Sequence, residues 1–77
     1  MSRLAYQARR ATGLSQRAFA RLIDVHPATV GRWESCERAP TATARTLLRL
    51  IEAKPAVCVE LLHAVRRDDR IDAARDG

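Results

Sequence analysis

The apolar residues of this chain recur at helical spacing in five segments, and no segment alternates apolar and polar residues as a β-strand does. Gly13 suits the left-handed position that follows many helices, and Thr41 and Pro55 suit helix starts. The sequence therefore predicts an all-α fold with five helices. These cover Ser2 or Arg3 to Thr12, 15–23, 27–35, 42–53 and the residues from 55 onward.

The predicted helices over 15–23 and 27–35 lie very close together in the sequence. Ser15 can cap the first of them, because its hydroxyl can accept a free backbone N–H, and Phe19 and Leu22 follow at helical spacing. Pro27 can begin the second, where its missing N–H has no partner to lose. Only residues 24–26 separate the two helices, so a tight turn must join them. This arrangement predicts a helix–turn–helix, which places its second helix in the major groove of DNA.

The positive charge of the chain is concentrated at its beginning. The formal net charge is +5, and residues 1–23 contain arginines but no acidic residue, whereas acids and bases balance over 24–77. Clustered arginines can neutralise DNA phosphates. A GC-rich genome would also favour arginine over lysine, but it would not explain the clustering. The charge distribution therefore favours a polyanionic partner.

The chain divides into a domain and a short tail. Residues 1–65 contain nearly all of the apolar positions, whereas 66–77 have mixed charge and either extend the last helix or fray. A 77-residue chain buries only about 60% of its unfolded surface, so its core must be thin. Domains of this size are often supplemented by dimerisation.

Several classes of protein are disfavoured. We expect no membrane span, because no apolar run approaches 18 residues, and no signal peptide at the N-terminus. Gly-rich phosphate loops, paired carboxylates and Ser/His/Asp arrangements are absent from the sequence, so we expect neither an enzyme nor a cofactor. We expect no metal site either, since His26, Cys36, Cys58 and His63 have irregular spacing on separate predicted helices. The two cysteines should be free thiols in a reducing cytoplasm.

Several short motifs together resemble the signature of the Xre/Cro (lambda-repressor-like) helix–turn–helix regulators. They are Gly13-Leu14-Ser15-Gln16, Phe19-Ala20, Thr29-Val30, Trp33-Glu34 and Pro40. Downstream, Leu47-Leu48-Arg49-Leu50-Ile51 and Pro55 resemble the HigA- and MqsA-type antitoxin DNA-binding domains. The likeness covers roughly residues 3 to 65. It implies a lambda-repressor-like DNA-binding domain in a cytoplasmic protein associated with a bacterial or phage nucleoid.

The resemblance also implies roles for single residues. Arg9 and Glu34 stand where the family has an ion pair that bridges its first and third helices, and Gln16 stands at a position that contacts the DNA backbone. Two residues depart from the family pattern. Asp24 replaces a turn glycine, at modest cost because aspartate tolerates left-handed backbone, and Cys36 replaces a glycine that usually follows the recognition helix.

The helical phase of 27–35 predicts which residues read DNA bases. Val30 and Trp33 lie three apart and should face the core, which leaves an outward strip on the opposite side. Arg32 is the strongest candidate on that strip, because a guanidinium can donate two hydrogen bonds to O6 and N7 of guanine. The predicted base-reading residues are Pro27, Ala28, Thr29, Gly31 and Arg32. A solvated helix face with Arg32 as an ordinary surface charge is the alternative.

A second set of residues is predicted to contact DNA phosphates. Gln16 lies in the first turn of its predicted helix, where free backbone N–H groups already favour a phosphate. His26 can either touch a phosphate or cap the helix that starts at Pro27. The predicted phosphate contacts are Gln16, Arg17, His26, Ser35 and Arg38.

The last predicted helix has more apolar residues than one packing stripe needs. Val57, Cys58, Leu61 and Val65 are predicted to pack on the core. Val59 and Leu62 extend the apolar arc beyond that stripe, and a contiguous exposed patch usually marks an interface. We therefore expect a homodimer that uses Val59 and Leu62.

These features predict a sequence-specific transcriptional regulator, a repressor that binds a palindromic double-stranded DNA operator as a homodimer. One alternative is an antitoxin that also binds a protein toxin and represses its own promoter. Another is a helical protein-interaction module without DNA binding, which the placement of Gln16, Thr29 and Arg32 disfavours. The antitoxin alternative stays open.

Overall fold

The computed structural model describes the backbone of residues 3–76 and the side chains of residues 3–66. The described residues form five helices and contain no strand, so the predicted all-α fold is confirmed. The helices are α1 (Leu4–Thr12), α2 (Gln16–Ile23), α3 (Pro27–Glu34), α4 (Ala42–Ala53) and α5 (Pro55–Asp76). The first helix begins at Leu4, slightly later than predicted, and Ser2 lies outside the described residues.

Short polar side chains begin three of these helices. The Ser15 hydroxyl accepts the Ala18 N–H at 3.1 Å at the start of α2, and the Thr41 hydroxyl accepts the Ala44 N–H at 3.2 Å at the start of α4. At the start of α3, Nδ1 of His26 accepts the Ala28 N–H at 3.0 Å. Each cap satisfies a backbone donor that has no partner within its helix, which explains why the helices start where they do.

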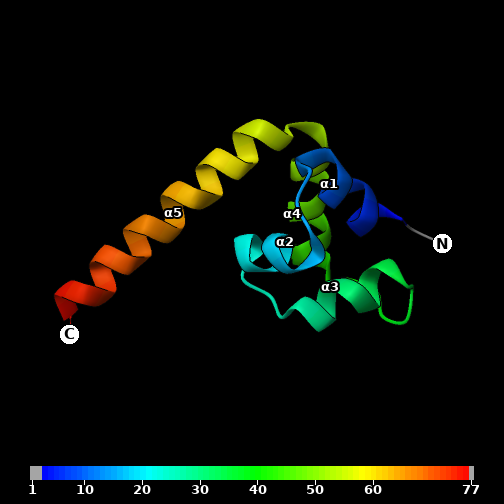
Figure 1. Cartoon of the computed structure of the whole chain (residues 1–77), viewed down its shortest axis with the longest axis horizontal. Helices are drawn as coiled ribbons and strands as arrows, with labels where there is room; N and C mark the ends of the chain where they lie inside the picture. The colour runs from blue at the N-terminus through cyan, green and yellow to red at the C-terminus, as the bar shows by residue number, and fades with distance from the viewer. Residues whose placement is uncertain (1–2, 77) are drawn as a thin grey trace.

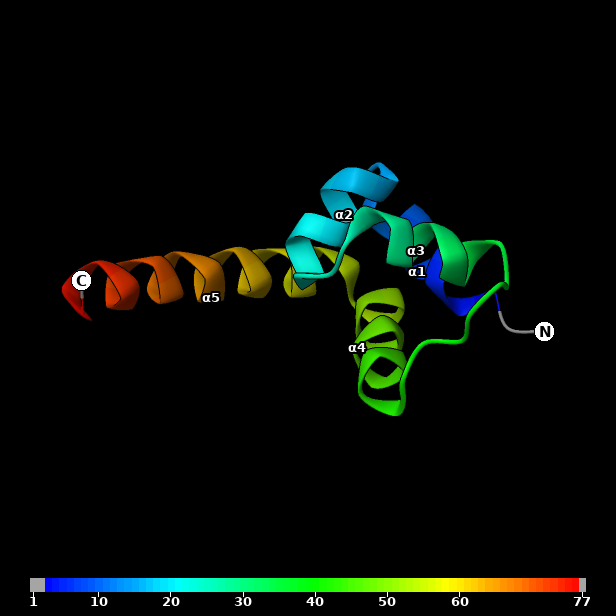
Figure 2. The ribbon, with the colours of Figure 1, turned by 90° about the horizontal axis from the view of Figure 1, so that it is seen from below.

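The core lies among the first four helices. Figure 2 shows these helices grouped together, with α5 leading away from them. Phe19, Val30, Leu48 and Ile51 are the largest fully buried side chains of the core, and they come from α2, α3 and α4. α1 contributes the buried residues Ala5 and Ala8, whose small side chains let its backbone approach α4 closely. Trp33 is 7% exposed and joins the same cluster, so α3 is anchored from its inner side.

Of the four α5 residues predicted to pack on the core, Cys58 does so and the other three are exposed. Cys58 and Leu62 contact the core, whereas Val57, Leu61 and Val65 are 52%, 59% and 53% exposed. Leu62, which the sequence assigned to a dimer interface, is half-buried against the core of its own protomer, and its role in an interface stays a prediction. Val59 is half-buried.

The rotation of α5 has two structural causes. A single residue, Lys54, separates it from α4, which leaves the turn little freedom. One turn beyond Leu62, the Arg66 guanidinium donates to the carbonyl oxygen of Arg21 near the end of α2. These two constraints turn the row of residues 58, 62 and 66 toward the core. Figure 1 shows α5 extending well beyond the other helices, with a continuous helical backbone through residues 66–76.

Two residues without glycine's freedom have left-handed backbone. Asp24 has φ +62° at the end of α2, and Cys36 has φ +65° just after α3. At Cys36, the N–H of Glu37 donates to the Arg32 carbonyl at 2.9 Å, a bond that commonly closes a helix end around a left-handed residue. The backbone therefore has the form that a glycine would favour, although a cysteine occupies the position.

Cys36→Gly is expected to stabilise the domain. Left-handed backbone costs an ordinary residue about 1–2 kcal/mol, and the greater freedom of glycine in the unfolded chain offsets about 0.5–1 kcal/mol of that relief. A net gain of about 0.5–1 kcal/mol should appear as a higher urea midpoint with an unchanged slope. Asp24→Gly is the matched control and should change stability little, because aspartate tolerates this conformation. Destabilisation by Cys36→Gly would contradict the argument.

Candidate nucleic-acid interface

The helix α3 presents two different sides. Val30 and Trp33 are buried on the inner side, while Ala28, Arg32 and Ser35 are exposed on the outer side. Of the other predicted base-reading residues, Pro27 is exposed, and Thr29 and Gly31 are half-buried. The predicted outward strip therefore lies on the surface, with its small residues on either side of Arg32.

Arg32 is the only charged residue of that strip. Its side chain is exposed and forms no hydrogen bond or ion pair with another described side chain. Nothing within the described domain therefore occupies the donor groups of its guanidinium. An arginine in this state can donate both hydrogen bonds to an external acceptor, as guanine recognition requires.

An ion pair holds α3 against α1. Arg9 donates from Nε to Oε2 of Glu34 at 2.7 Å and from Nη2 to Oε1 at 3.0 Å, which is the paired geometry that guanidinium and carboxylate groups favour. Nη1 of Arg9 also donates to the Leu14 carbonyl at 3.0 Å, just before α2. The structure thus forms the ion pair that the family resemblance implies, and it links α1, α3 and the segment that leads into α2.

The surroundings of this ion pair shift the pKa values of both groups. Burial raises the pKa of the Glu34 carboxyl. Hydrogen bonds from Arg9 and Gln16, together with the charge of Arg9, lower this pKa by more than burial raises it. The net result is a pKa below the ordinary glutamate value. The hydrogen bond with Glu34 raises the pKa of the Arg9 guanidinium. Both groups are therefore held in their charged forms.

Gln16 has a structural partner that the sequence did not reveal. Its Nε2 donates to Oε1 of Glu34 at 3.1 Å, so the first residue of α2 is hydrogen-bonded to the last residue of α3. A Cβ added at Gly31 would lie 3.8 Å from Oε1 of Gln16, which is ordinary contact. A Cβ at this position would therefore fit beside the Gln16 amide, so the space there does not require glycine. The amide remains exposed, and Nε2 has a second hydrogen for an external acceptor.

The other predicted phosphate contacts lie on the surface near α2 and α3. His26 caps α3 through Nδ1, so in the neutral imidazole Nε2 carries the proton and can donate outward. The Ser35 hydroxyl donates to the Arg32 carbonyl at 3.3 Å, but the residue remains exposed. Arg17 and Arg38 are exposed and form no ion pair with other described side chains.

A cluster of arginines around Tyr6 was also not predicted from the sequence. The guanidinium carbons of Arg3, Arg9 and Arg10 lie 5.2, 5.6 and 5.8 Å from the centre of the Tyr6 ring. Cations at this distance over an aromatic face are attracted by its electrons. Tyr6 therefore gathers part of the N-terminal positive charge on one side of α1. The spacing of Arg3, Tyr6 and Arg10 along a helix is the signal that could have indicated it.

Two features are absent from the described residues. No helix among them is both long and apolar enough to cross a membrane. They also contain no group of three or more side chains that could hold a metal ion. Neither Cys36 nor Cys58 forms a disulfide within the described part of the chain.

Comparison with known proteins identifies the family. A model of the helix-turn-helix family matches residues 6–53, which include α2, α3, α4 and most of α1. The chain therefore belongs to the Xre-like helix-turn-helix family.

The curated relatives carry the same domain. The uncharacterised HTH-type transcriptional regulator YiaG of Escherichia coli K12 is 41% identical over 56 residues, which are 73% of this chain and 58% of that protein. YiaG of Escherichia coli O157:H7 matches equally well. The chain thus spans less than two thirds of the length of these relatives. No solved structure gives a significant match.

Proposed function

We propose that this chain is a sequence-specific transcriptional regulator that inserts α3 into the major groove of DNA. The observation that carries the proposal is the outer side of α3, where the exposed guanidinium of Arg32, which has no partner among the described side chains, stands among small residues. Small side chains let a helix backbone approach the base edges, and Arg32 can then reach guanine. The relatives in Escherichia coli are named as transcriptional regulators, which agrees with this function.

The residues beside α3 support binding to the DNA backbone. Gln16, Arg17 and His26 are exposed at or near the start of α2 or α3. The start of a helix carries partial positive charge and free N–H groups, both of which favour a phosphate. The arginines of residues 1–23 add a sequence-independent attraction whose strength falls as salt is added. We assign affinity to this set and base discrimination to Pro27, Ala28, Thr29, Gly31 and Arg32.

Selection from a pool of random duplexes tests this function directly. The protein should enrich one short motif with a guanine, and its affinity for that motif should exceed its affinity for random duplexes by about 10³-fold or more at physiological salt. Binding without enrichment would leave only a nonspecific polyanion binder. No binding at low salt would favour the protein-interaction module over a DNA-binding regulator.

A two-fold symmetric assembly would allow the protein to specify a unique DNA site. One helix with a single strong base-reading side chain cannot specify a unique site, whereas two copies double the contacts. We propose a repressor that binds a palindromic operator as a homodimer, with half-sites about 34–36 Å apart. Of the two interface residues proposed from the sequence, Leu62 is half-buried against the core of its own protomer, and Val59 is also half-buried. We therefore extend the proposed interface to the exposed apolar row of Val57, Leu61 and Val65 on α5.

Leu61→Glu is expected to convert the dimer into a monomer. Leu61 is 59% exposed and lies at the middle of the row on α5, about one helical turn from Val57 and from Val65. A charge there would have to be desolvated at the interface, but it would remain in water in the monomer. Light scattering at micromolar concentration should show half the mass. Glu60→Lys, at an exposed position beside the row, is the control and should remain dimeric. A monomeric wild-type protein would refute the dimer.

An antitoxin is the alternative function that the same surface favours. The apolar row on α5 could bind a toxin, while α3 binds the promoter of the gene pair. Coexpression with the product of the neighbouring gene distinguishes the two functions. A stable complex that Leu61→Glu disrupts would support an antitoxin, and a protein that copurifies only with itself would support a homodimeric repressor.

A further inference from the structure

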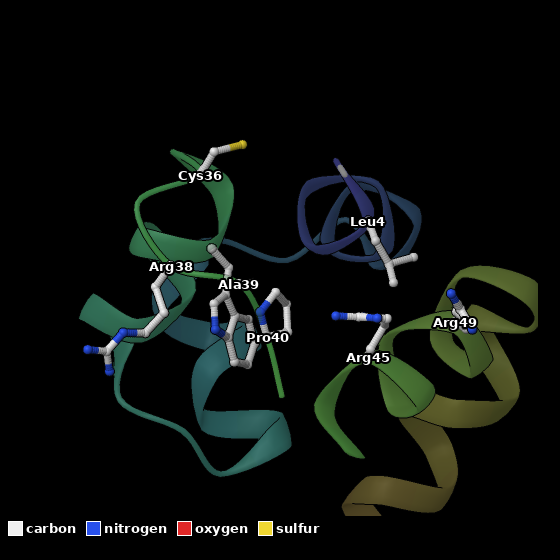
Figure 3. Close-up of a pocket in the computed structure, with 8 residues that line it drawn as sticks. Leu4, Cys36, Arg38, Ala39, Pro40, Arg45 and Arg49 are labelled. Atoms are coloured by element: carbon white, nitrogen blue, oxygen red, sulfur yellow. The ribbon is translucent and has the colours of Figure 1, made fainter. Parts of the chain in front are cut away.

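A cavity of about 390 Å³ lies on the inner side of α3, away from the outward strip. It is bounded by the start of α1, the end of α3, the loop after α3 and one side of α4 (Figure 3). Its walls include the apolar residues Leu4, Trp33, Ala39 and Pro40. Arg38, Arg45 and Arg49 also line it, and no acidic residue is among the described residues of its lining.

The arginines differ in how they lie. Figure 3 shows the Arg45 guanidinium extending from α4 toward the loop at Pro40, with Arg49 on the same helix and Arg38 directed away. Arg45 and Arg49 are four residues apart, where like charges on a helix face repel each other. Neither forms an ion pair with another described side chain. The cavity therefore combines an apolar wall with two cations that have no counter-charge within the described domain.

We propose that this cavity binds a small organic carboxylate with an apolar body. A guanidinium has a planar set of donors that matches the two oxygens of a carboxylate, so Arg45 and Arg49 can hold the charged end. Trp33, Pro40 and Leu4 offer the apolar surface for the rest of the molecule. A volume of about 390 Å³ lies within the usual range of small-molecule sites.

The position of the cavity links it to α3. Trp33 is the inner anchor of α3, and Pro40 belongs to the loop that follows it. A ligand that contacts both of these residues, and also Arg45 and Arg49, would hold the end of α3 relative to α4. If α3 reads DNA, as proposed above, the carboxylate should alter DNA affinity as an effector. Binding of the carboxylate itself does not depend on that function and can be measured without DNA.

Trp33 makes this test simple, because it is the one tryptophan of the chain and it lines the cavity. Titration of the whole chain with phenylacetate should change the tryptophan fluorescence in a saturable manner in the millimolar range or below. Phenylacetamide has nearly the same shape without the charge and should give no saturable change. Inorganic phosphate has the charge without the apolar body and should also give none.

Two variants locate the binding. Arg45→Gln and Arg49→Gln should each weaken phenylacetate binding about tenfold, because each loses charge-assisted hydrogen bonds. Arg21→Gln changes an exposed arginine outside the cavity lining and should bind normally. Both replaced arginines of α4 are exposed, and circular dichroism would verify that the variants are folded.

Three results would overturn the proposal: no saturable response to phenylacetate, an equal response to phenylacetamide or phosphate, or normal binding by both Arg45→Gln and Arg49→Gln. Failure of the wild-type protein to bind DNA, together with a normal phenylacetate titration, would count against the regulator function and not against this site.

Discussion

Arg32→Ala is expected to abolish the preference for guanine at one base pair of each half-site. The loss of specific affinity should be about 1–3 kcal/mol for each contact, and a dimer would lose two contacts. Arg32 is the one charged side chain on the outer strip of α3, so no other residue of the strip can replace it. Its guanidinium has no partner in the described domain and is available to a base. Titration of wild-type and variant protein against the selected operator and a guanine-substituted operator would measure both effects.

Arg17→Ala is the matched control for this prediction. Arg17 is also exposed, but it lies in the first turn of α2, where a phosphate contact is proposed. Its removal should weaken specific and random duplexes alike and reduce the salt dependence by about one counterion. Equal losses on operator and random DNA for Arg32→Ala would show that Arg32 contacts the backbone. Base readout would then have to be reassigned.

The order and limits of the helices could be predicted from the sequence because local residues determine them. Ser15 and Thr41 cap their helices through their own hydroxyl groups, and Gly13 has the left-handed backbone expected of it. Pro27 begins α3 as predicted. None of these features depends on residues far away in the chain, so a single sequence is sufficient to place them.

The orientation of α5 could not be predicted in the same way. Two neighbouring rows of this helix are apolar, one with Val57 and Leu61 and the other with Cys58 and Leu62. Periodicity alone cannot choose between two apolar rows. The choice depends on the turn at Lys54 and on the contact between Arg66 and the end of α2, which exist only in the folded domain.

The same limit applies to the candidate sites. The exposed side of α3 follows from its apolar phase, so Arg32 could be found from the sequence. The bond from Gln16 to Glu34 depends on how α2 and α3 cross, and the cavity depends on the path of the loop over Pro40. Arg45 and Arg49 look like ordinary solvated charges in the sequence. Only the fold brings them to an apolar wall.

Glu34→Ala is expected to have the largest effect on stability. The Glu34 side chain is 8% exposed and that of Arg9 is 17% exposed. The variant therefore leaves a guanidinium that is largely shielded from water, and among the described residues the Leu14 carbonyl is its one remaining hydrogen-bond acceptor. Removing one partner of such a pair costs about 3–5 kcal/mol, and water that still reaches Arg9 favours the lower end. The total free energy of unfolding of a domain of this size is roughly 4–12 kcal/mol. Urea denaturation of the variant should therefore show much of the stability lost.

Two variants distinguish the effect of the Glu34 charge from the effect of the volume of its side chain. Glu34→Gln retains an acceptor for Arg9 but loses the charge, so it should be less destabilising than Glu34→Ala. The double variant Arg9→Met/Glu34→Leu removes both charges and should recover most of the loss, because apolar residues often replace a shielded ion pair at little cost. A double variant as unstable as Glu34→Ala would mean that packing around Arg9 and Glu34 dominates.

The pH dependence follows from the same pair. The pKa of Glu34 is lower in the folded domain than its ordinary value, so the folded state holds the ionised carboxylate more favourably than the unfolded chain does. Its contribution is complete above the pKa of an unfolded glutamate, and it is lost as the pH falls through the lowered pKa of the folded state. Denaturation measured from neutral to acidic pH should therefore show falling stability for the wild-type protein. The decline should be shallower for Glu34→Gln, which has no proton to bind at this position; parallel curves would show that other carboxylates cause the acid sensitivity.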